Sequence, residues 1–157
     1  MPHFKCAFVV CDDALQSDDI SGFSQGHFIV EGPDAQASTL DNKSSNMIFL
    51  SCSLLLQQTA RFFRNTASRL LEFIPLESSM VFYFIRTPGK RIRLKAGRTD
   101  LGEISEDDLL HGIKKCAEEL ISLARERLPV SDVGRSDLEA SFEAFAALCE
   151  KRRPTDL

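Results

Sequence analysis

The chain has 157 residues, of which 43% are hydrophobic and 27% are charged, and its formal net charge is −4. This balance is typical of a globular domain and excludes collagen-like, disulfide-scaffold and intrinsically disordered classes. At this length about two-thirds of the unfolded surface can be buried, so a single domain spanning residues 1–157 is expected. No apolar run approaches the roughly 20 residues of a membrane span, so no membrane contact is expected.

Residues 1–45 are predicted to form an acidic region of strands and loops. The run 4–11 is partly β-branched and aromatic and ends at two aspartates, which is typical of a buried strand. Residues 12–25 are rich in Asp, Ser and Gly and predict an exposed loop. A second strand is expected at 27–31, followed by a turn-like segment at 34–45 that we expect to be mobile.

Residues 46–128 are predicted to contain the core, beginning with a strand and a helix. Residues 47–50 are expected to form the strand. The helix after it should be capped by Ser51 or Ser53 and should end near Arg69, since apolar residues recur in it at helical spacing.

A β-hairpin is the clearest local pattern. After a strand at 71–74, residues 80–85 lead into a turn in which a proline presets φ and Gly89 permits a positive φ. The partner strand, 91–96, alternates apolar and basic residues, so one of its faces should be basic. The residues expected on that face are Arg91, Arg93 and Lys95.

Two more helices complete the predicted fold. Ser105 is placed to cap the first, which ends before Pro129. The second spans 136–152 and opens with Ser136 and Glu139 in a capping pattern. Together the patterns predict an α+β fold, with a mostly antiparallel sheet of about five to six strands and three helices packed on it.

The sequence lacks the local motifs of the common catalytic classes, among them GxxxxGK[ST], HExxH and GxSxG. Its five cysteines show no CxxC spacing, which indicates neither a disulfide framework nor a zinc site and favours a reducing cytoplasm. Cys116 and Cys149 fall on apolar helix stripes, where packing is favoured over reactivity. We therefore predict a protein that is not an enzyme and holds no cofactor or metal, although a Cys–His pair formed in space stays open.

Charge divides the chain into three parts. Residues 1–45 hold seven acidic and two basic residues, residues 46–100 hold three and nine, and residues 101–157 hold thirteen and eight. The acidic parts could attract a basic partner, whereas the central part leaves contact with a polyanion open.

Two sets of charged residues are candidates for binding. The loop carboxylates lack the EF-hand order, so a solvated loop or a protein contact is favoured over calcium. The carboxylates expected to meet a basic partner are Asp12, Asp13, Asp18, Asp19, Glu103, Glu106 and Asp107. The alternative is an anion site on Arg91, Arg93 and Lys95, but no aromatic residue is interleaved there for base stacking, which disfavours nucleic acid. An exposed sheet face on which those bases discourage edge-to-edge association is favoured over an anion site.

The order of elements over residues 47–121 resembles small immunity proteins that protect bacteria from polymorphic or contact-dependent toxins. The segments that carry the resemblance are LLEFIPLESSMVFYFIRTPGKRIRLKAG and LGEISEDDLLHGIKKCAEELI, which follow the predicted strand and helix. The resemblance implies a non-enzymatic cytoplasmic inhibitor that binds one cognate toxin domain, such as a basic nuclease, and masks its active site. Acidic residues would steer such a partner by charge complementarity. The alternatives are a nucleic-acid or phosphate-ligand binding module and a small enzyme of unrecognised type.

Overall fold

The structure, a computed structural model, describes residues 3–11 and 20–152. Its strands are β1 (Lys5–Val10), β2 (Gln25–Glu31), β3 (Gln36–Ser38), β4 (Asn46–Met47), β5 (Leu70–Phe73), β6 (Phe82–Thr87), β7 (Arg91–Ala96) and β8 (Thr99–Ser105). Its helices are α2 (Ile48–Arg64), α3 (Glu106–Arg127) and α4 (Val133–Lys151), with a short 3-10 helix η1 (Thr39–Asn42). The α+β class is thus confirmed. Within the described residues, no helix is both long enough and apolar enough to cross a membrane.

The strands form two antiparallel sheets of four strands each, so the prediction of one sheet with about five to six strands is wrong. In the first sheet β2 pairs with β1, β3 and β4, and in the second β5 to β8 lie in chain order. The strand β8 is absent from the prediction because its sequence does not alternate cleanly. Leu101 and Gly102 are both buried, and a register shift opposite them falls between Leu94 and Lys95 of β7. A bulge of this kind breaks the period of two on which the prediction depends.

Phenylalanine rings join the two sheets. Phe28 of β2 stacks on Phe8 of β1 with 4.5 Å between ring centroids. The same ring meets Phe73 and Phe82 of the second sheet edge-on, at 5.4 Å and 4.9 Å. Because Phe28 is fully buried, this cluster forms the centre of the core, as the predominance of phenylalanine indicates.

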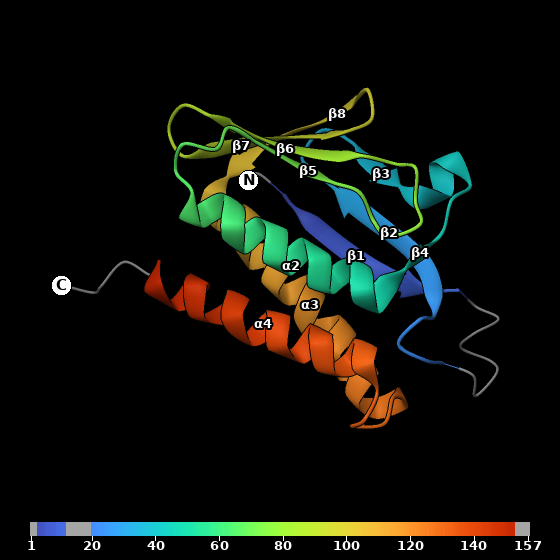
Figure 1. The fold of residues 1–157 in the computed structure, drawn as a ribbon. Coiled ribbons are helices and arrows are strands. Elements are labelled where there is room, and N and C mark those ends of the chain that lie inside the picture. Colours follow the sequence, from blue (N-terminus) through green and yellow to red (C-terminus); the bar gives the residue numbers. More distant parts are fainter. Residues whose placement is uncertain (1–2, 12–19, 153–157) are drawn as a thin grey trace.

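The helices form a layer beside the sheets, and α4 is the outermost of them (Figure 1). Helix α3 packs on β1 and α2 packs on β5, whereas α4 packs chiefly on α2 and α3. The expectation that all three helices lie directly on a sheet is therefore wrong for α4. Figure 1 also shows that α2 and α4 lie side by side and run in the same direction.

Helix α2 begins earlier and ends earlier than its sequence predicts. Only Asn46–Met47 is a strand, and the helix starts at Ile48 without a side-chain cap. Ser51 lies inside the helix, where its hydroxyl accepts a hydrogen bond from the backbone N–H of Leu76 at 2.9 Å. The apolar residues read as a strand are helical because both Ile48 and Phe49 are fully buried against the core.

Some of the caps and turns predicted from local sequence are confirmed, and others differ from the structure. Ser105 caps α3 by accepting from the N–H of Asp108, and Gly89 has φ 83°, as predicted. Helix α4 instead starts at Val133 with Asp132 as its cap, three residues before the predicted start. The segment 34–45, predicted to be turn-like, contains β3 and η1, because Ser38 and Asp41 form a reciprocal capping box.

Candidate binding surface

The basic residues of β7 lie on the outer face of the second sheet, and two of them have acidic partners. Arg91 Nε lies 2.8 Å from Glu103 Oε1, and Arg93 lies 2.8 Å from Asp100 Oδ2 and 3.1 Å from Glu103 Oε2. The hydrogen bond from Arg91 lowers the pKa of Glu103. The backbone N–H of Gly102, helped by the charge of Arg93, lowers the pKa of Asp100. Both carboxyls are therefore held in their charged form beside the bases.

The neighbouring strands add further groups to this face. Tyr83 of β6 stands between Glu72 of β5 and Lys95 of β7 in the strand register. Cross-strand neighbours share one face of a sheet, so the chain's single tyrosine lies beside a base, which the sequence of β7 alone does not reveal. With acids, bases and a ring side by side, the face attracts a polyanion less than its basic strand suggests.

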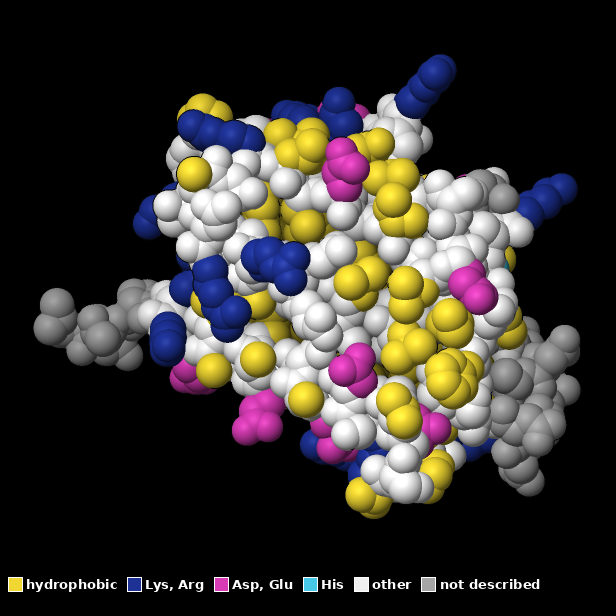
Figure 2. Space-filling view, in the orientation of Figure 1, with side chains coloured by type: hydrophobic (Ala, Val, Ile, Leu, Met, Phe, Trp, Pro, Cys, Tyr) yellow, Lys and Arg dark blue, Asp and Glu magenta, His cyan; other side chains and the backbone are white. Residues whose placement is uncertain are grey.

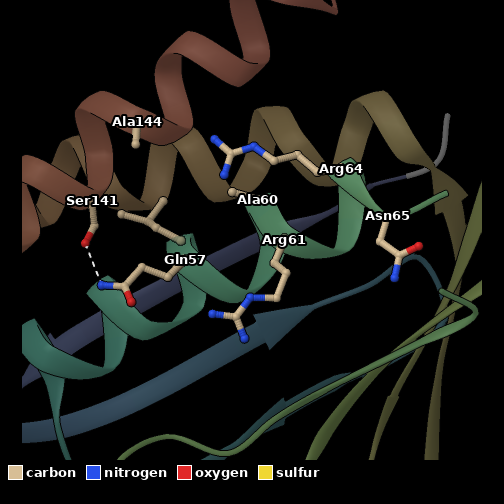
Figure 3. Close-up of a pocket in the computed structure, with 8 residues that line it drawn as sticks. Gln57, Ala60, Arg61, Arg64, Asn65, Ser141 and Ala144 are labelled. Carbon is tan, nitrogen blue, oxygen red and sulfur yellow. Dashed lines mark hydrogen bonds between the residues drawn. The ribbon is translucent and has the colours of Figure 1, made fainter. Parts of the chain in front are cut away.

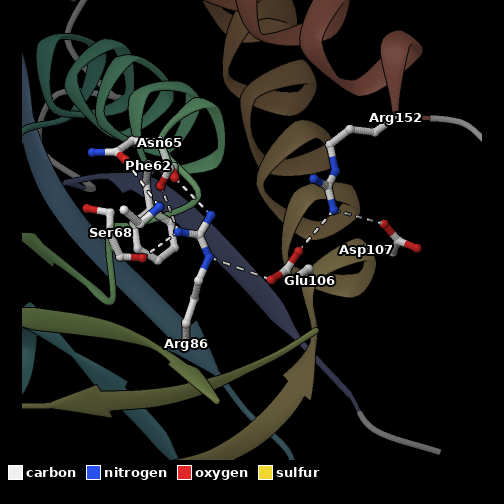
Figure 4. A network of polar contacts seen from close by, with 8 residues as sticks. Phe62, Asn65, Ser68, Arg86, Glu106, Asp107 and Arg152 are labelled. Atoms are coloured by element: carbon white, nitrogen blue, oxygen red, sulfur yellow. Dashed lines mark hydrogen bonds and ion pairs between the residues drawn. The ribbon is translucent and has the colours of Figure 1, made fainter. Parts of the chain in front are cut away.

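Glu106, one of the predicted partner-binding carboxylates, is occupied within the chain (Figure 4). Its carboxylate lies 3.7 Å from Arg86 Nε and 3.0 Å from Arg152 Nη2, and its side chain is only 12% exposed. It therefore joins β6, the start of α3 and the end of α4. The adjacent Asp107 is 84% exposed and lies 3.9 Å from Arg152, so its carboxylate is open to solvent.

Arg86 also closes the end of α2 (Figure 4). Its guanidinium donates to the carbonyls of Phe62 at 2.8 Å and Asn65 at 3.0 Å, and to the carbonyl of Ser68. The same group lies 4.0 Å from the centroid of the Phe62 ring. Carbonyls at a helix end have no helical donor, so Arg86 supplies what the geometry of α2 leaves unsatisfied.

The predicted loop carboxylates Asp12, Asp13, Asp18 and Asp19 lie outside the described residues. The chain is described again from Ile20, whose side chain is buried. Two residues later the N–H of Gly22 donates to Asp132 Oδ2 at 3.0 Å, at the start of α4. The segment that follows the acidic residues in the sequence is thus held against α4.

Three large apolar side chains are exposed where this segment meets α4. Phe23 is 61% exposed, Val130 is 80% exposed and Val133 is 69% exposed. Gly22 precedes Phe23 and Gly134 follows Val133, and the backbones of these two glycines approach closely, since a Cβ on Gly134 would lie 2.6 Å from the Cα of Gly22. Phe23, Val130 and Val133 are referred to below as the apolar surface.

The described charges near the apolar surface are of both signs. Arg135, two residues after Val133, donates to the carbonyl of Leu128 and pairs with Glu139. Asp137 follows Val133 by one helical turn and lines the same shallow hollow. Glu77 accepts a hydrogen bond from Gln25, two residues after Phe23. Figure 2 shows hydrophobic side chains gathered over the N-terminal ends of α2 and α4, whereas lysines and arginines gather near the C-terminal ends of these helices. The surface thus combines apolar contact area with charged side chains of both signs.

The thiols lie mostly in the interior. Cys6, Cys52 and Cys116 are buried. A side-chain hydrogen bond with Cys116, followed by burial, raises the pKa of Cys6, and burial raises the pKa of Cys52. Thiols with a raised pKa are poor nucleophiles, which supports the packing role of these cysteines. In the part of the chain that the structure describes, no three His, Cys, Asp or Glu side chains are grouped so as to hold a metal ion.

The apolar surface cannot be recognised in the sequence. Its residues stand in two polar stretches, around residues 20–25 and 129–134, that lie far apart in the chain. Isolated apolar residues in such stretches are common, and only the contact between Gly22 and Gly134 shows that these ones meet. Comparison with protein-family models, with curated proteins and with solved structures finds no match.

Proposed function

We propose that the protein is a non-enzymatic immunity protein that binds a bacterial toxin domain in the cytoplasm and neutralises it. The observation that supports this proposal best is the apolar surface, where Phe23, Val130 and Val133 are each more than half exposed. Exposed apolar residues are ordinary when they are scattered, but several that the fold brings to one region of the surface are typical of a protein contact. The toxin as partner is what the resemblance implies.

The carboxylates around this surface would favour a basic partner. Asp137 and Glu77 are among the described residues near it, and Asp18 and Asp19 directly precede Ile20 in the sequence. Carboxylates around a contact accelerate the association of a positively charged partner. Reversing the charge of Asp12, Asp13, Asp18 and Asp19 should therefore slow association and weaken its dependence on salt.

The proposal is tested by a growth assay with the toxin domain encoded beside the gene, since immunity genes stand next to the genes of their toxins. Expression of that domain alone should arrest growth, and co-expression of the wild-type chain should restore it. The double variant Phe23→Asp, Val133→Asp should fail to restore growth, because two buried charges would face the partner.

A matched control separates the contact from a general effect of added charge. Leu40 is 57% exposed and lies on η1, so Leu40→Asp adds one such charge at an exposed apolar residue outside the apolar surface and should restore growth. Arrest that the wild-type chain does not relieve contradicts the proposed function. Equal relief by the double variant contradicts the role of the apolar surface.

A further inference from the structure

A groove of about 410 Å³ lies between the parallel helices α2 and α4 (Figure 3). The residues that line it are Leu56, Gln57, Ala60, Arg61, Arg64, Asn65, Ser141 and Ala144. Its walls combine short apolar side chains with polar ones, and none of the lining residues is acidic. This composition is unlike that of the apolar surface, which lies near the opposite ends of the two helices.

One end of the groove is fixed by a hydrogen bond between the helices. Gln57 Nε2 donates to Ser141 Oγ at 2.9 Å. Ser141 is only 8% exposed, and because its oxygen accepts here, its own O–H remains to donate. Asn65, at the other end, accepts through Oδ1 from the N–H of Ala67 at 3.2 Å, so its amide N–H groups also remain to donate. The groove is therefore rich in hydrogen-bond donors.

Two arginines add positive charge to these donors. Among the described residues, no carboxylate lies within ion-pair distance of Arg61 or Arg64. Figure 3 shows Arg64 extending across Ala60 toward α4, with the Arg61 side chain on the other side of the groove. Glu72 and Arg61 both line a neighbouring hollow, but they lie beyond ion-pair distance of each other. The groove is therefore positively charged.

The location of Arg61 and Arg64 at the C-terminal end of α2 explains only in part why these two residues are basic. Bases are favoured in the last turn of a helix because its carbonyls are exposed there. In α2, however, Asn65 N–H and the Arg86 guanidinium already donate to the carbonyls of Arg61 and Phe62. The positive charges in the groove are thus left without a strong local partner.

We propose that this groove binds a small organic anion. Arg61 and Arg64 would hold its phosphate or carboxylate group, since a planar guanidinium matches both groups through paired N–H donors. The apolar body of the ligand would lie against Ala60 and Ala144. The site is independent of the proposed toxin contact and uses none of its residues.

The test is a titration of the full chain with three ligands that share one ring, namely phenyl phosphate, benzoate and benzyl alcohol, followed by NMR and calorimetry. At least one of the two anions should bind saturably and shift the amide signals of residues 57–65 and 141–144, and benzyl alcohol should not. The anion with the higher affinity identifies the preferred head group. Arg61→Gln and Arg64→Gln should each weaken its binding about ten-fold, as expected for a lost charged hydrogen bond.

Arg98→Gln is the matched control, because Arg98 is an exposed arginine outside the groove, in the turn between β7 and β8 of the second sheet. This variant should bind the anion as the wild-type chain does, and all three variants should keep the wild-type melting temperature. Absence of saturable anion binding overturns the proposal. The proposal is also overturned if the Arg61→Gln and Arg64→Gln variants bind the anion with wild-type affinity. It is overturned as well if Arg98→Gln loses as much affinity as they do.

Discussion

At the scale of single residues, Arg86 contributes most to holding separate elements together. It bonds the last carbonyls of α2, covers the ring of Phe62 and faces the carboxylate of Glu106. Its side chain is only 10% exposed, so these contacts are largely withdrawn from water. A partly buried charge of this kind is costly to leave without its partner.

Replacing Arg86 by methionine keeps much of the apolar stem and removes every donor. Glu106 would then keep only Arg152, and the carbonyls of Phe62 and Asn65 would lose their donor. We expect the free energy of unfolding to fall by about 3 kcal/mol in denaturant titrations. The variant Arg98→Met should change it by less than about 0.5 kcal/mol, as is usual at exposed positions. Similar values for the two variants would show that the Arg86 contacts stabilise little.

At the scale of elements, α3 and α4 each have a side-chain cap at the N-terminus, but the two caps have different roles. Ser105 Oγ accepts only the N–H of Asp108 within its own helix. Asp132 accepts the N–H of Arg135 through Oδ1 and the N–H of Gly22 through Oδ2, both at 3.0 Å. Asp132 therefore caps α4 and also holds the segment that carries Phe23.

The two caps are expected to separate stability from binding. Ser105→Ala should lower the free energy of unfolding by about 1 kcal/mol and leave the affinity for the toxin domain unchanged. Asp132→Ala should cost more stability, because two N–H groups lose their acceptor, and should also weaken the complex by releasing Phe23. Denaturant titrations and calorimetry of the complex measure the two effects. Equal affinity of the Asp132→Ala variant and the wild-type chain would contradict the role of this segment.

At the scale of the whole molecule, the clearest electrostatic feature is a set of partly exposed carboxyls beside arginines. The hydrogen bond from Gly102 lowers the pKa of Asp100, and arginine donors lower those of Glu103 and Glu139. The ordinary values are 3.8 for Asp100 and 4.5 for the two glutamates. In the unfolded chain these groups therefore bind protons more readily than in the folded chain.

The direction of the pH dependence follows from these shifts. The three carboxyls with lowered pKa values stabilise the folded chain fully when the pH is above their ordinary pKa values. This contribution to the free energy of unfolding is lost as the pH falls through their lower pKa values in the folded chain. We expect the melting temperature to fall between about pH 5 and about pH 2. Glu103→Gln should reduce this fall, because that residue no longer titrates. A fall of the same size in the variant would assign the acid sensitivity to other groups.

Features set by local sequence were predictable, and those set by contacts between distant segments were not. The hairpin turn at Gly89 and the Ser105 cap depend on a few adjacent residues, and both are confirmed. The strand β8 was not predicted because its bulge breaks the alternation. Arg91 and Arg93 pair with Glu103 of that strand, so these ion pairs could not be predicted either. The apolar surface depends on a contact between residues 110 positions apart.

The most direct test of the account is differential affinity capture from the native cells. The tagged wild-type chain, Leu40→Asp, and the double variant Phe23→Asp, Val133→Asp would each be isolated in moderate salt, and the bound material identified. We expect one stoichiometric basic protein on the wild-type chain and on Leu40→Asp, absent from the double variant, and able to arrest growth when expressed alone. Recovery of nucleic acid, of nothing, or of the same protein on all three chains would contradict the account.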